Sequence, residues 1–168
     1  EVILRVENLS AVSQIHKRPV LQDVSFDIKS GEILGIAGID GNGQTELVRA
    51  LIGLQKLTEG KIYLHNEEIT HLPVRDMREA GIGVIPEDRL QEGLVIDFDI
   101  KENLILGLQR GEPFSKNGLF DWKAVSTNAD KLVGKFDIRT PNIQHIARLL
   151  SGGNQQKVIV AREIFHAP

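Results

Sequence analysis

The stretch GIDGNGQTE, Gly38 to Glu46, governs the fold expected of this chain. A phosphate-binding P-loop consists of a glycine, four free positions, a second glycine, a lysine, and then serine or threonine. Gly38, Gly43 and Thr45 fit this pattern, but Gln44 stands at the lysine position. The stretch is therefore a nucleotide site that has lost its cation, a glycine-rich turn without a ligand, or a site adapted to something other than catalysis.

The segments on either side of the loop supply the context that a P-loop needs. Before it, ILGIA (residues 33–37) is continuously apolar, which is typical of a strand buried on both faces of a parallel sheet. After it, TELVRALIGL (residues 45–54) has apolar residues at helical spacing and a glycine near its end. Backbone N–H groups of such a loop, with the start of the helix, can bind phosphate oxygens. The predicted apolar stripe of the helix is Leu47, Val48, Leu51 and Ile52, and its predicted stop is Gly53.

Gln44 weakens the predicted site. A lysine delivers a full charge to the β and γ phosphates, whereas a glutamine is neutral and shorter, which costs on the order of 1–2 kcal/mol of binding. Catalysis should suffer more, because phosphoryl transfer depends on electrostatic stabilisation of charge at the γ phosphate. Glu46 adds a negative charge near the same phosphates. We expect a loop that holds a nucleotide but splits it poorly.

Antiparallel β-structure is predicted before the loop. The segment VSFDIKSGE, residues 24–32, alternates apolar and polar side chains, as a half-exposed strand does. Alternate apolar positions in residues 2–6 supply its antiparallel partner, and Ser30 with Gly31 turns the chain. Further elements predicted after the loop are a strand and a turn near Asn66, a helix that starts at Pro73 and stops at Gly81, and a short buried strand over residues 82–86.

The second half of the chain is predicted to be helical. Asp99 and Glu102 form the pattern of a capping box. Asp121 caps a longer helix, and the intervening segment RGEPFSKNG, residues 110–118, is rich in helix breakers and predicts a loop. The apolar residues of the longer helix recur at helical spacing: Trp122, Val125, Ala129, Leu132, Val133 and Phe136.

Composition limits the function classes. The net charge of −3 gives no support for a general nucleic-acid or membrane-surface role, either of which favours a basic excess. The absence of cysteine excludes disulfides and cysteine-ligated zinc. The length of 168 residues suits one domain with a sizeable core. Because the chain starts at Glu1 and stops directly after a strong helix pattern, we expect it to be a piece of a longer polypeptide.

A second motif, LLSGGNQQKVIVAREIF, covers residues 149–165. Ser151 is a good N-cap, and the two glycines after it leave the start of the helix open to an anion. By composition alone, a capped helix with a flexible entry is the preferred interpretation of the motif. The apolar face predicted for this helix is Val158, Ala161, Ile164 and Phe165.

Together, the glycine loop and LSGGNQQ resemble the Walker A and signature motifs of ATP-binding-cassette (ABC) transporter ATPases. The resemblance covers nearly the whole chain, because VENLS, LQDVSFDIKSGEILGIAG, the loop, GVIPEDR and the signature occur in family order. In more detail, the chain resembles the second, degenerate cassette of the fused ATPases of sugar and nucleoside importers. GIDGNGQTEL, IPEDRLQEGLV, EPFSKNG and FDIRTP are most similar to the nucleoside branch.

The resemblance implies an α/β fold: a P-loop NTPase (RecA-like) core with an antiparallel β subdomain and a helical subdomain, truncated before the Walker B strand. Residues 1–168 would be one partial nucleotide-binding domain. The implied parts are the β subdomain and P-loop core over residues 1–89, the helical subdomain facing the membrane subunits over 90–150, and the signature helix over 151–168.

The resemblance also implies the site residues. The Walker A residues would be Gly38, Asp40, Gly41, Asn42, Gly43, Gln44, Thr45 and Glu46. Glu87 stands where the family usually carries the Q-loop glutamine, and the Mg²⁺ contacts would be Thr45 and Glu87. The signature residues would be Leu150, Ser151, Gly152, Gly153, Asn154 and Gln155. The aromatic residue that usually stacks on adenine has only a weak substitute, His16.

The implied cofactors are ATP and Mg²⁺. The implied partners are a second ATP-binding cassette, transmembrane permease subunits and, indirectly, a solute-binding protein, at the cytoplasmic face of the plasma membrane and without nucleic acid. Ser151, Gly152 and Gly153 would reach the γ phosphate of ATP held by the partner cassette in a head-to-tail dimer. The Walker B carboxylates, the D-loop and the switch histidine are expected beyond Pro168, so we expect no catalytic residue in this segment and no activity from it alone.

Two other functions remain open at this point. In one, the complete cassette hydrolyses ATP by itself and tolerates Gln44. In the other, the protein is a non-transport ABC ATPase that acts as a mechanical switch in translation or DNA repair. Co-purification with membrane subunits distinguishes the latter from an importer.

Overall fold

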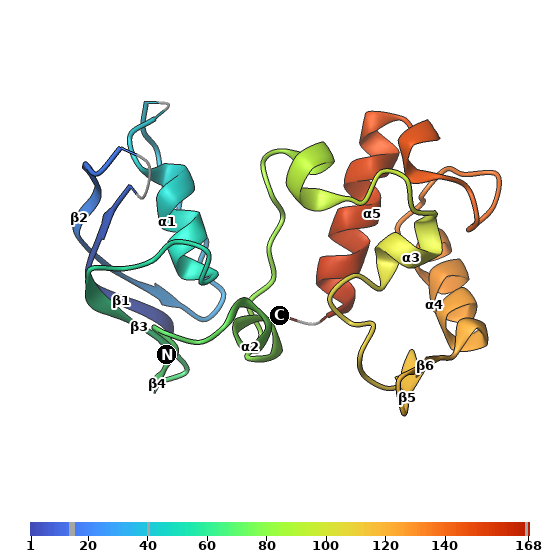
Figure 1. Ribbon diagram of the computed structural model, residues 1–168, viewed down its shortest axis with the longest axis horizontal. Helices are drawn as coiled ribbons and strands as arrows, with labels where there is room; N and C mark the ends of the chain where they lie inside the picture. The colour runs from blue at the N-terminus through green and yellow to red at the C-terminus, as the bar shows by residue number, and fades with distance from the viewer. Residues whose placement is uncertain (14–15, 40, 167) are drawn as a thin grey trace. The chain divides into compact units, whose positions relative to one another are not determined.

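The computed structural model describes residues 1–13, 16–39, 41–166 and 168, which form two compact units, Glu1–Ile82 and Gly83–Pro168 (Figure 1). The first unit contains an antiparallel sheet with two helices, and the second is mainly helical. The predicted division of the chain near residue 89 remains a prediction. No helix in the described part of the chain is long and apolar enough to span a bilayer.

The first unit is built on a four-stranded antiparallel sheet with the strand order β2-β1-β3-β4. β1 lies between β2 and β3, so Val6 on β1 is opposite Phe26 on β2 and opposite Ile62 on β3. The predicted hairpin is confirmed, and so is the turn before β4, where Asn66 has a positive φ. The strands are β1 (Val2–Val12), β2 (Pro19–Lys29), β3 (Glu59–Leu64) and β4 (Glu67–Glu68).

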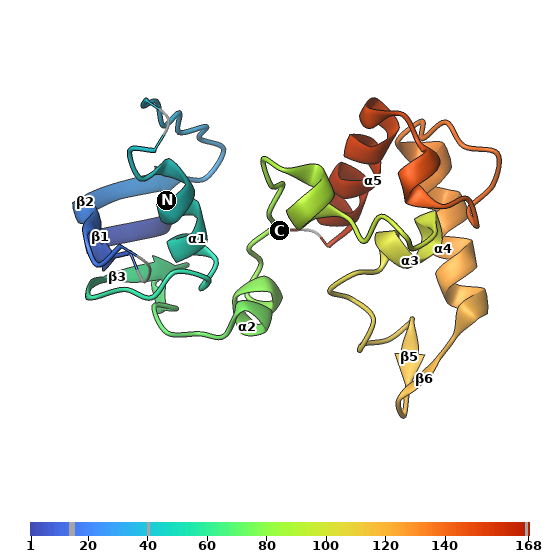
Figure 2. The ribbon, with the colours of Figure 1, turned by 45° about the horizontal axis from the view of Figure 1, so that its top comes forward.

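Helix α1 (Gln44–Leu51) packs against this sheet and completes the core of the first unit (Figures 1 and 2). Leu47 and Ala50 are its buried residues, whereas Val48, predicted to belong to the buried stripe, is 48% exposed. The helix therefore buries a narrower face than its composition predicts. Gly53, with φ +77°, is confirmed as the stop. The buried cluster contains Val6, Leu9, Ala11, Leu21, Leu47, Ala50, Ile62 and Ile69.

Helix α2 (Val74–Glu79) follows the sheet. Pro73 precedes its first helical residue, so it occupies the N-cap rather than the predicted first position. Gly81 has φ +108° and comes directly after the C-cap Ala80, as predicted for the stop.

Both predicted buried strands of a parallel sheet are wrong for the structure described here. Residues 33–37 and 82–86 have no strand conformation, and Ile33 is 96% exposed while Ile85 is 51% exposed. A parallel strand is stable when neighbouring strands take its backbone hydrogen bonds and helices cover both faces. No strand in the described residues pairs with either segment. Ile82 packs against the core of the first unit, but neither segment pairs with a described strand, so their apolar composition is not sufficient to form one.

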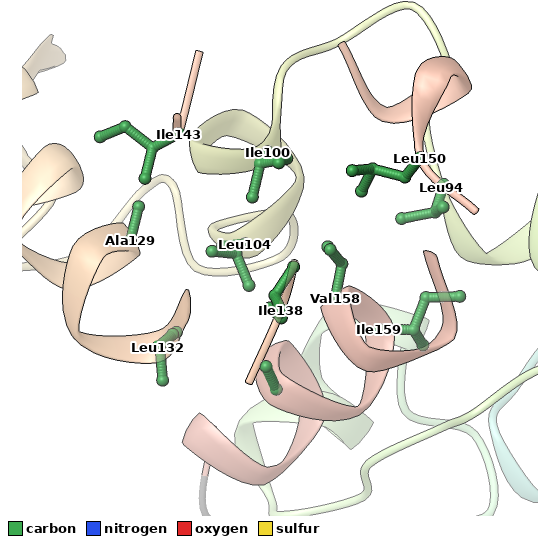
Figure 3. Packing of buried hydrophobic residues seen from close by; sticks show 11 residues of the cluster. Leu94, Ile100, Leu104, Ala129, Leu132, Ile138, Ile143, Leu150, Val158 and Ile159 are labelled. Atoms are coloured by element: carbon green, nitrogen blue, oxygen red, sulfur yellow. The ribbon is translucent and has the colours of Figure 1, made fainter. Parts of the chain in front are cut away.

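The second unit packs three helices around one core, which Figure 3 shows from close by. Side chains from α3, α4 and α5 point toward one another there, with loop residues such as Ile138 and Ile143 between them. The elements are η1 (Arg89–Gly93), α3 (Ile100–Leu104), β5 (Ser115–Lys116), β6 (Leu119–Phe120), α4 (Trp122–Lys135), η2 (Ala147–Leu149) and α5 (Gly152–Phe165).

Two predicted helix starts of the second unit are confirmed. Asp99 Oδ1 accepts from the backbone N of Glu102, and Glu102 Oε2 accepts from the backbone N of Asp99, which completes the capping box. Asp121 Oδ1 accepts from the backbone N of Ala124 at the start of α4. On α4, Val125, Ala129 and Leu132 are buried as predicted, but Trp122 is 48% exposed.

The segment predicted as a loop, residues 110–118, contains strand β5 and the turn of the small hairpin β5–β6, and β6 follows directly after it. Asn117 and Gly118 form its turn with φ values of 53° and 80°. Two consecutive positive φ values favour an Asn-Gly pair and match the twist of short hairpins. The hairpin projects from the helical body in both ribbon views (Figures 1 and 2).

Helix α5 buries polar as well as apolar residues. Val158 and Ala161 are buried as predicted, whereas Ile164 is 51% exposed. In the next turn Arg162 and Glu163 are 6% and 3% exposed, respectively. The predicted apolar face is therefore wrong at its C-terminal end, because a buried ion pair takes the place of the last apolar contacts.

Candidate functional site

The glycine loop has a backbone that other residues adopt only with strain. Gly41 and Gly43 have φ values of +81° and +100°. A Cβ at position 43 would lie 2.6 Å from the carbonyl oxygen of Val20, so both conformation and space require glycine. The loop closes with a hydrogen bond from the backbone N of Asn42 to the carbonyl oxygen of Ile39 at 3.2 Å. Asp40, a predicted Walker A residue, lies outside the described residues.

Gln44 is the first residue of α1 and folds back over the loop. Its Nε2 donates to the carbonyl oxygen of Ile39 at 3.3 Å. A Cβ at Gly38 would overlap that same Nε2, so the glycine makes room for the glutamine amide. The side chain at the lysine position therefore provides a neutral hydrogen-bond donor that holds the loop closed.

The residues after Gln44 leave polar groups at the surface. Thr45 is exposed in the first turn of α1, and Glu46 is half-buried beside it. Asn42 and Gly41 are exposed on the other side of the bend. A Cβ at Gly41 would meet nothing within 4 Å, so the backbone at this exposed bend is open to an anion, as a phosphate site requires.

The described residues contain no group of three or more His, Cys, Asp or Glu side chains arranged to hold a metal ion. Thr45 belongs to the first unit, and Glu87, at the predicted Q-loop position, is exposed in the second. Their joint role toward Mg²⁺ remains a prediction. His16, the weak candidate for adenine stacking, is exposed in a turn. Its backbone N donates to Ser13 Oγ at 3.1 Å.

The signature residues surround the N-terminus of α5 and divide into buried and exposed sets. Leu150 is 8% exposed and joins the core, and Gln155 is 6% exposed. Ser151 and Gly153 are exposed. The first and last residues of the motif are therefore buried, whereas its serine and second glycine are exposed to solvent.

Ser151 occupies the predicted N-cap position, but its side chain makes no capping hydrogen bond to the helix backbone. Its Oγ instead accepts from Asn154 Nδ2 at 2.9 Å. The prediction that the hydroxyl caps the helix is therefore wrong, because the Asn154 amide occupies it.

Gln155 ties the signature helix to the segment that follows Glu87. Its Oε1 accepts from Arg89 Nε at 3.1 Å, and its Nε2 donates to the carbonyl oxygen of Ala147 at 3.1 Å. The guanidinium group lies so close to the helix start that a Cβ at Gly152 would be 2.8 Å from Arg89 Nη2. Sequence reasoning passed over Arg89, although it ends the segment GVIPEDR that contributes to the family resemblance.

An ion pair connects α5 to the loop that contains Asp137 and Arg139. Lys157 Nζ donates to Asp137 Oδ2 at 2.9 Å and to the Asp137 carbonyl oxygen at 2.5 Å. The hydrogen bond from Lys157, its charge and that of Arg139 lower the pKa of the Asp137 carboxyl below its usual value. The carboxylate is therefore charged throughout the neutral range.

The sequence matches the family model for ABC transporters over residues 21–168. The chain belongs to the ABC transporter family. The resemblance drawn from its motifs is thereby confirmed at family level, while its assignment to a second cassette remains a prediction.

Relatives of this ABC chain include import proteins. It is 42% identical over its full length to the nucleoside import ATP-binding protein NupA of Lactococcus lactis subsp. cremoris, of which it covers 33%. It is 46% identical over 88% of its length to the guanosine import ATP-binding protein NupO of Bacillus subtilis, of which it covers 29%. It is 39% identical over its full length to a Lactococcus lactis ribose import ATP-binding protein, RbsA, of which it covers 32%. The chain thus spans about a third of the length of these relatives.

Solved structures confirm the fold class. The crystal structure of the ADP conformation of MJ1267, an ATP-binding cassette of an ABC transporter, matches all of this chain with a TM-score of 0.75 and 25% identity, over 66% of that cassette. A nucleotide-free ATP-binding cassette matches it with a TM-score of 0.78 and 24% identity, also over 66% of its length. The chain therefore has the fold of an ABC cassette, although the predicted parallel strands are not formed in the residues described.

Proposed function

We propose that this chain is part of the ATP-binding subunit of an importer for nucleosides or sugars and works at the cytoplasmic face of the membrane with permease subunits and a solute-binding protein. The observation that carries the proposal is the exposed Ser151–Gly153 turn on a firmly anchored α5, in a chain that matches the ABC family. The names of its relatives, which are nucleoside, guanosine and ribose import ATP-binding proteins, support the substrate class.

In this proposal the glycine loop holds a nucleotide phosphate tail. A Cβ at Gly41 would meet nothing within 4 Å, so a phosphate oxygen could come close to the exposed backbone at this glycine. The Thr45 hydroxyl and Glu87, through water, would contact the magnesium ion that accompanies ATP. Magnesium neutralises phosphate charge when it is bound.

Gln44 makes this loop a clamp rather than a hydrolytic site. Its amide donates to the loop carbonyl of Ile39, and it has no charge to offer the γ phosphate. The described segment also offers no group that we assign as a catalytic base. We therefore assign hydrolysis to the other composite site, which a second cassette forms together with the signature of this chain.

The signature would complete that second site. A helix N-terminus attracts anions through its unpaired N–H groups, and the serine hydroxyl adds a directed donor. Ser151 and Gly153 are exposed, so a second molecule or domain can reach them. Leu150 and Gln155, both buried, would keep the turn in place when the γ phosphate arrives.

Substitution of Ser151 tests this proposal. In the full-length protein assembled with its permease, Ser151→Ala is expected to lower the ATPase kcat at least tenfold, because one directed donor to transferring phosphate is lost. Ser126→Ala, on α4, is the matched control and should leave kcat unchanged. Unaltered turnover in Ser151→Ala, or failure of the protein to co-purify with membrane subunits, would contradict the proposal.

A further inference from the structure

The Asn154 side chain connects the signature serine to the loop in front of α5. Its Oδ1 accepts from the backbone N of Arg139 at 2.8 Å. Its Nδ2 donates to Ser151 Oγ at 2.9 Å. Both atoms of one amide are thus engaged, one by a backbone group and one by the hydroxyl.

The chemistry of these partners determines which end of the amide faces which. A backbone N–H can only donate, so the Asn154 atom that faces Arg139 must be the oxygen. The NH₂ group is then directed at Ser151, whose oxygen must accept. The hydroxyl has one proton and has already used its oxygen toward Asn154, so that proton points elsewhere. Since the hydroxyl caps no backbone group of α5 and Ser151 is exposed, the proton is available to an incoming acceptor.

The loop over residues 137–139, which contacts Asn154, also contacts a second side chain of α5. Lys157, three residues after Asn154 on the same helix, donates to both the carbonyl and the carboxylate of Asp137. Residues three apart lie on one face of a helix. Asn154 and Lys157 of α5 therefore hold residues 137–139, including the Arg139 N–H that orients the amide.

We infer that Asn154 is a positioning residue that turns the Ser151 hydroxyl proton outward, toward the terminal phosphate held by the second cassette. This inference rests on the proposed function. A deprotonated phosphate oxygen only accepts hydrogen bonds, so a serine hydroxyl that donates to Asn154 has no proton left to donate to the phosphate. Asn154 prevents that inward orientation because its NH₂ group cannot accept.

Asn154→Asp tests the inference, since a carboxylate of the same shape still accepts from Arg139 but can only accept from Ser151. The hydroxyl proton then turns inward. In the full-length ATPase assembled with its permease, kcat is expected to fall about tenfold, approaching the value of Ser151→Ala. Gln144→Glu adds the same charge at an exposed loop position outside the signature motif, and its kcat should stay within about twofold of the wild type.

Asn154→Ala separates positioning from structural support. It removes both hydrogen bonds but leaves the serine free to rotate, so its kcat should lie between those of the wild type and Asn154→Asp, about threefold below the wild type. A merely structural role predicts the opposite order, because alanine loses more contacts than aspartate does. An alanine variant slower than the aspartate variant would therefore overturn the inference.

The double variant Ser151→Ala/Asn154→Asp completes the test. If Asn154 acts through Ser151, the double variant has the kcat of Ser151→Ala, whereas independent effects multiply. Multiplying losses, or an Asn154→Asp variant as fast as wild type beside a slow Ser151→Ala variant, overturn the positioning role alone. A Ser151→Ala variant with full turnover overturns the proposed function and this inference with it.

Discussion

Gln44 replaces the lysine of the P-loop pattern while the glycines of the loop are kept. The loop keeps the glycines that its positive φ values and close contacts demand. At the position of the usual cation, however, a neutral amide donates to Ile39 of the same loop. In the proposed function, this loop would therefore bind phosphate through its backbone without the charge that catalysis needs.

Restoring the cation is the prediction that belongs to this residue. Gln44→Lys in the full-length protein should tighten MgATP binding at this loop about tenfold, because a charge-assisted hydrogen bond replaces a neutral one, on the order of 1–2 kcal/mol. Isothermal titration measures the affinity, and turnover under the same conditions reports any gain in hydrolysis. Gln22→Lys, an exposed position on β2, controls for added charge. Equal affinities of the two variants would contradict the prediction.

Among the elements, α5 combines the exposed signature turn at its start with a buried polar anchor near its end. Arg162 Nε donates to Glu163 Oε1 at 2.7 Å, and Arg162 Nη1 donates to the carbonyl oxygen of Gly93 at 3.0 Å. Glu163 Oε2 accepts from the backbone N of Val84 at 3.2 Å. The segment on either side of Glu87 is thus hydrogen-bonded to the helix that carries Ser151.

Removing the cation of this anchor should destabilise the second unit strongly. Arg162→Met removes one partner of a buried ion pair with Glu163, which costs about 3–5 kcal/mol of unfolding free energy. The same substitution at Arg139, whose side chain is 83% exposed, should change it by less than about 0.5 kcal/mol. Urea unfolding followed by tryptophan fluorescence compares the two. Similar losses in both variants would count against a structural role of the buried pair.

The link between Asp137 and Lys157 predicts a pH dependence. Its hydrogen bond lowers the pKa of Asp137 from the ordinary value of 3.8, so the pair stabilises the fold above that value and is lost as the pH falls through the lower folded-state pKa. The stability difference between wild type and Asp137→Asn should be constant from about pH 5 to 8 and vanish in strong acid. Urea midpoints measured across this range give the difference. A difference that disappears near neutral pH would point to another group.

For the molecule as a whole, the unusual feature is apolar sequence at the surface. Ile33, Leu34 and Ile36 are 96%, 39% and 53% exposed in a segment without strand partners. A contiguous exposed apolar run with unpaired backbone groups is prone to pair with other chains. The chain taken alone should therefore self-associate.

A charge inside that run should reduce the association. Ile33→Lys is expected to shift the apparent mass of the isolated chain toward the monomer, as measured by light scattering over a concentration series. Leu119→Lys is the control, because Leu119 is 76% exposed but lies on the β5–β6 hairpin, outside the run. A wild-type chain that stays monomeric at all concentrations would refute the prediction.

Local patterns were sufficient for much of the architecture. The alternation of residues 24–28 predicted β2 and its partner, and the Asp99 and Asp121 caps predicted the starts of α3 and α4. These features depend on neighbours within a few residues, so short-range chemistry decides them. The family was likewise readable from motifs, because the glycine loop and LSGGNQQ are local stretches in a set order.

Long-range contacts decided the rest. The continuous apolar composition of residues 33–37 and 82–86 predicted buried strands. A strand also needs a neighbouring strand, and none of the described strands pairs with these segments. The contacts of Asn154 with Ser151 and Arg139, and of Arg89 with Gln155, join residues on different segments. By itself the sequence determined which groups could donate, accept or bend. Only the packing of α5 against its loops decided which of them meet, because hydrogen bonding depends on distance and direction, which residue order does not contain.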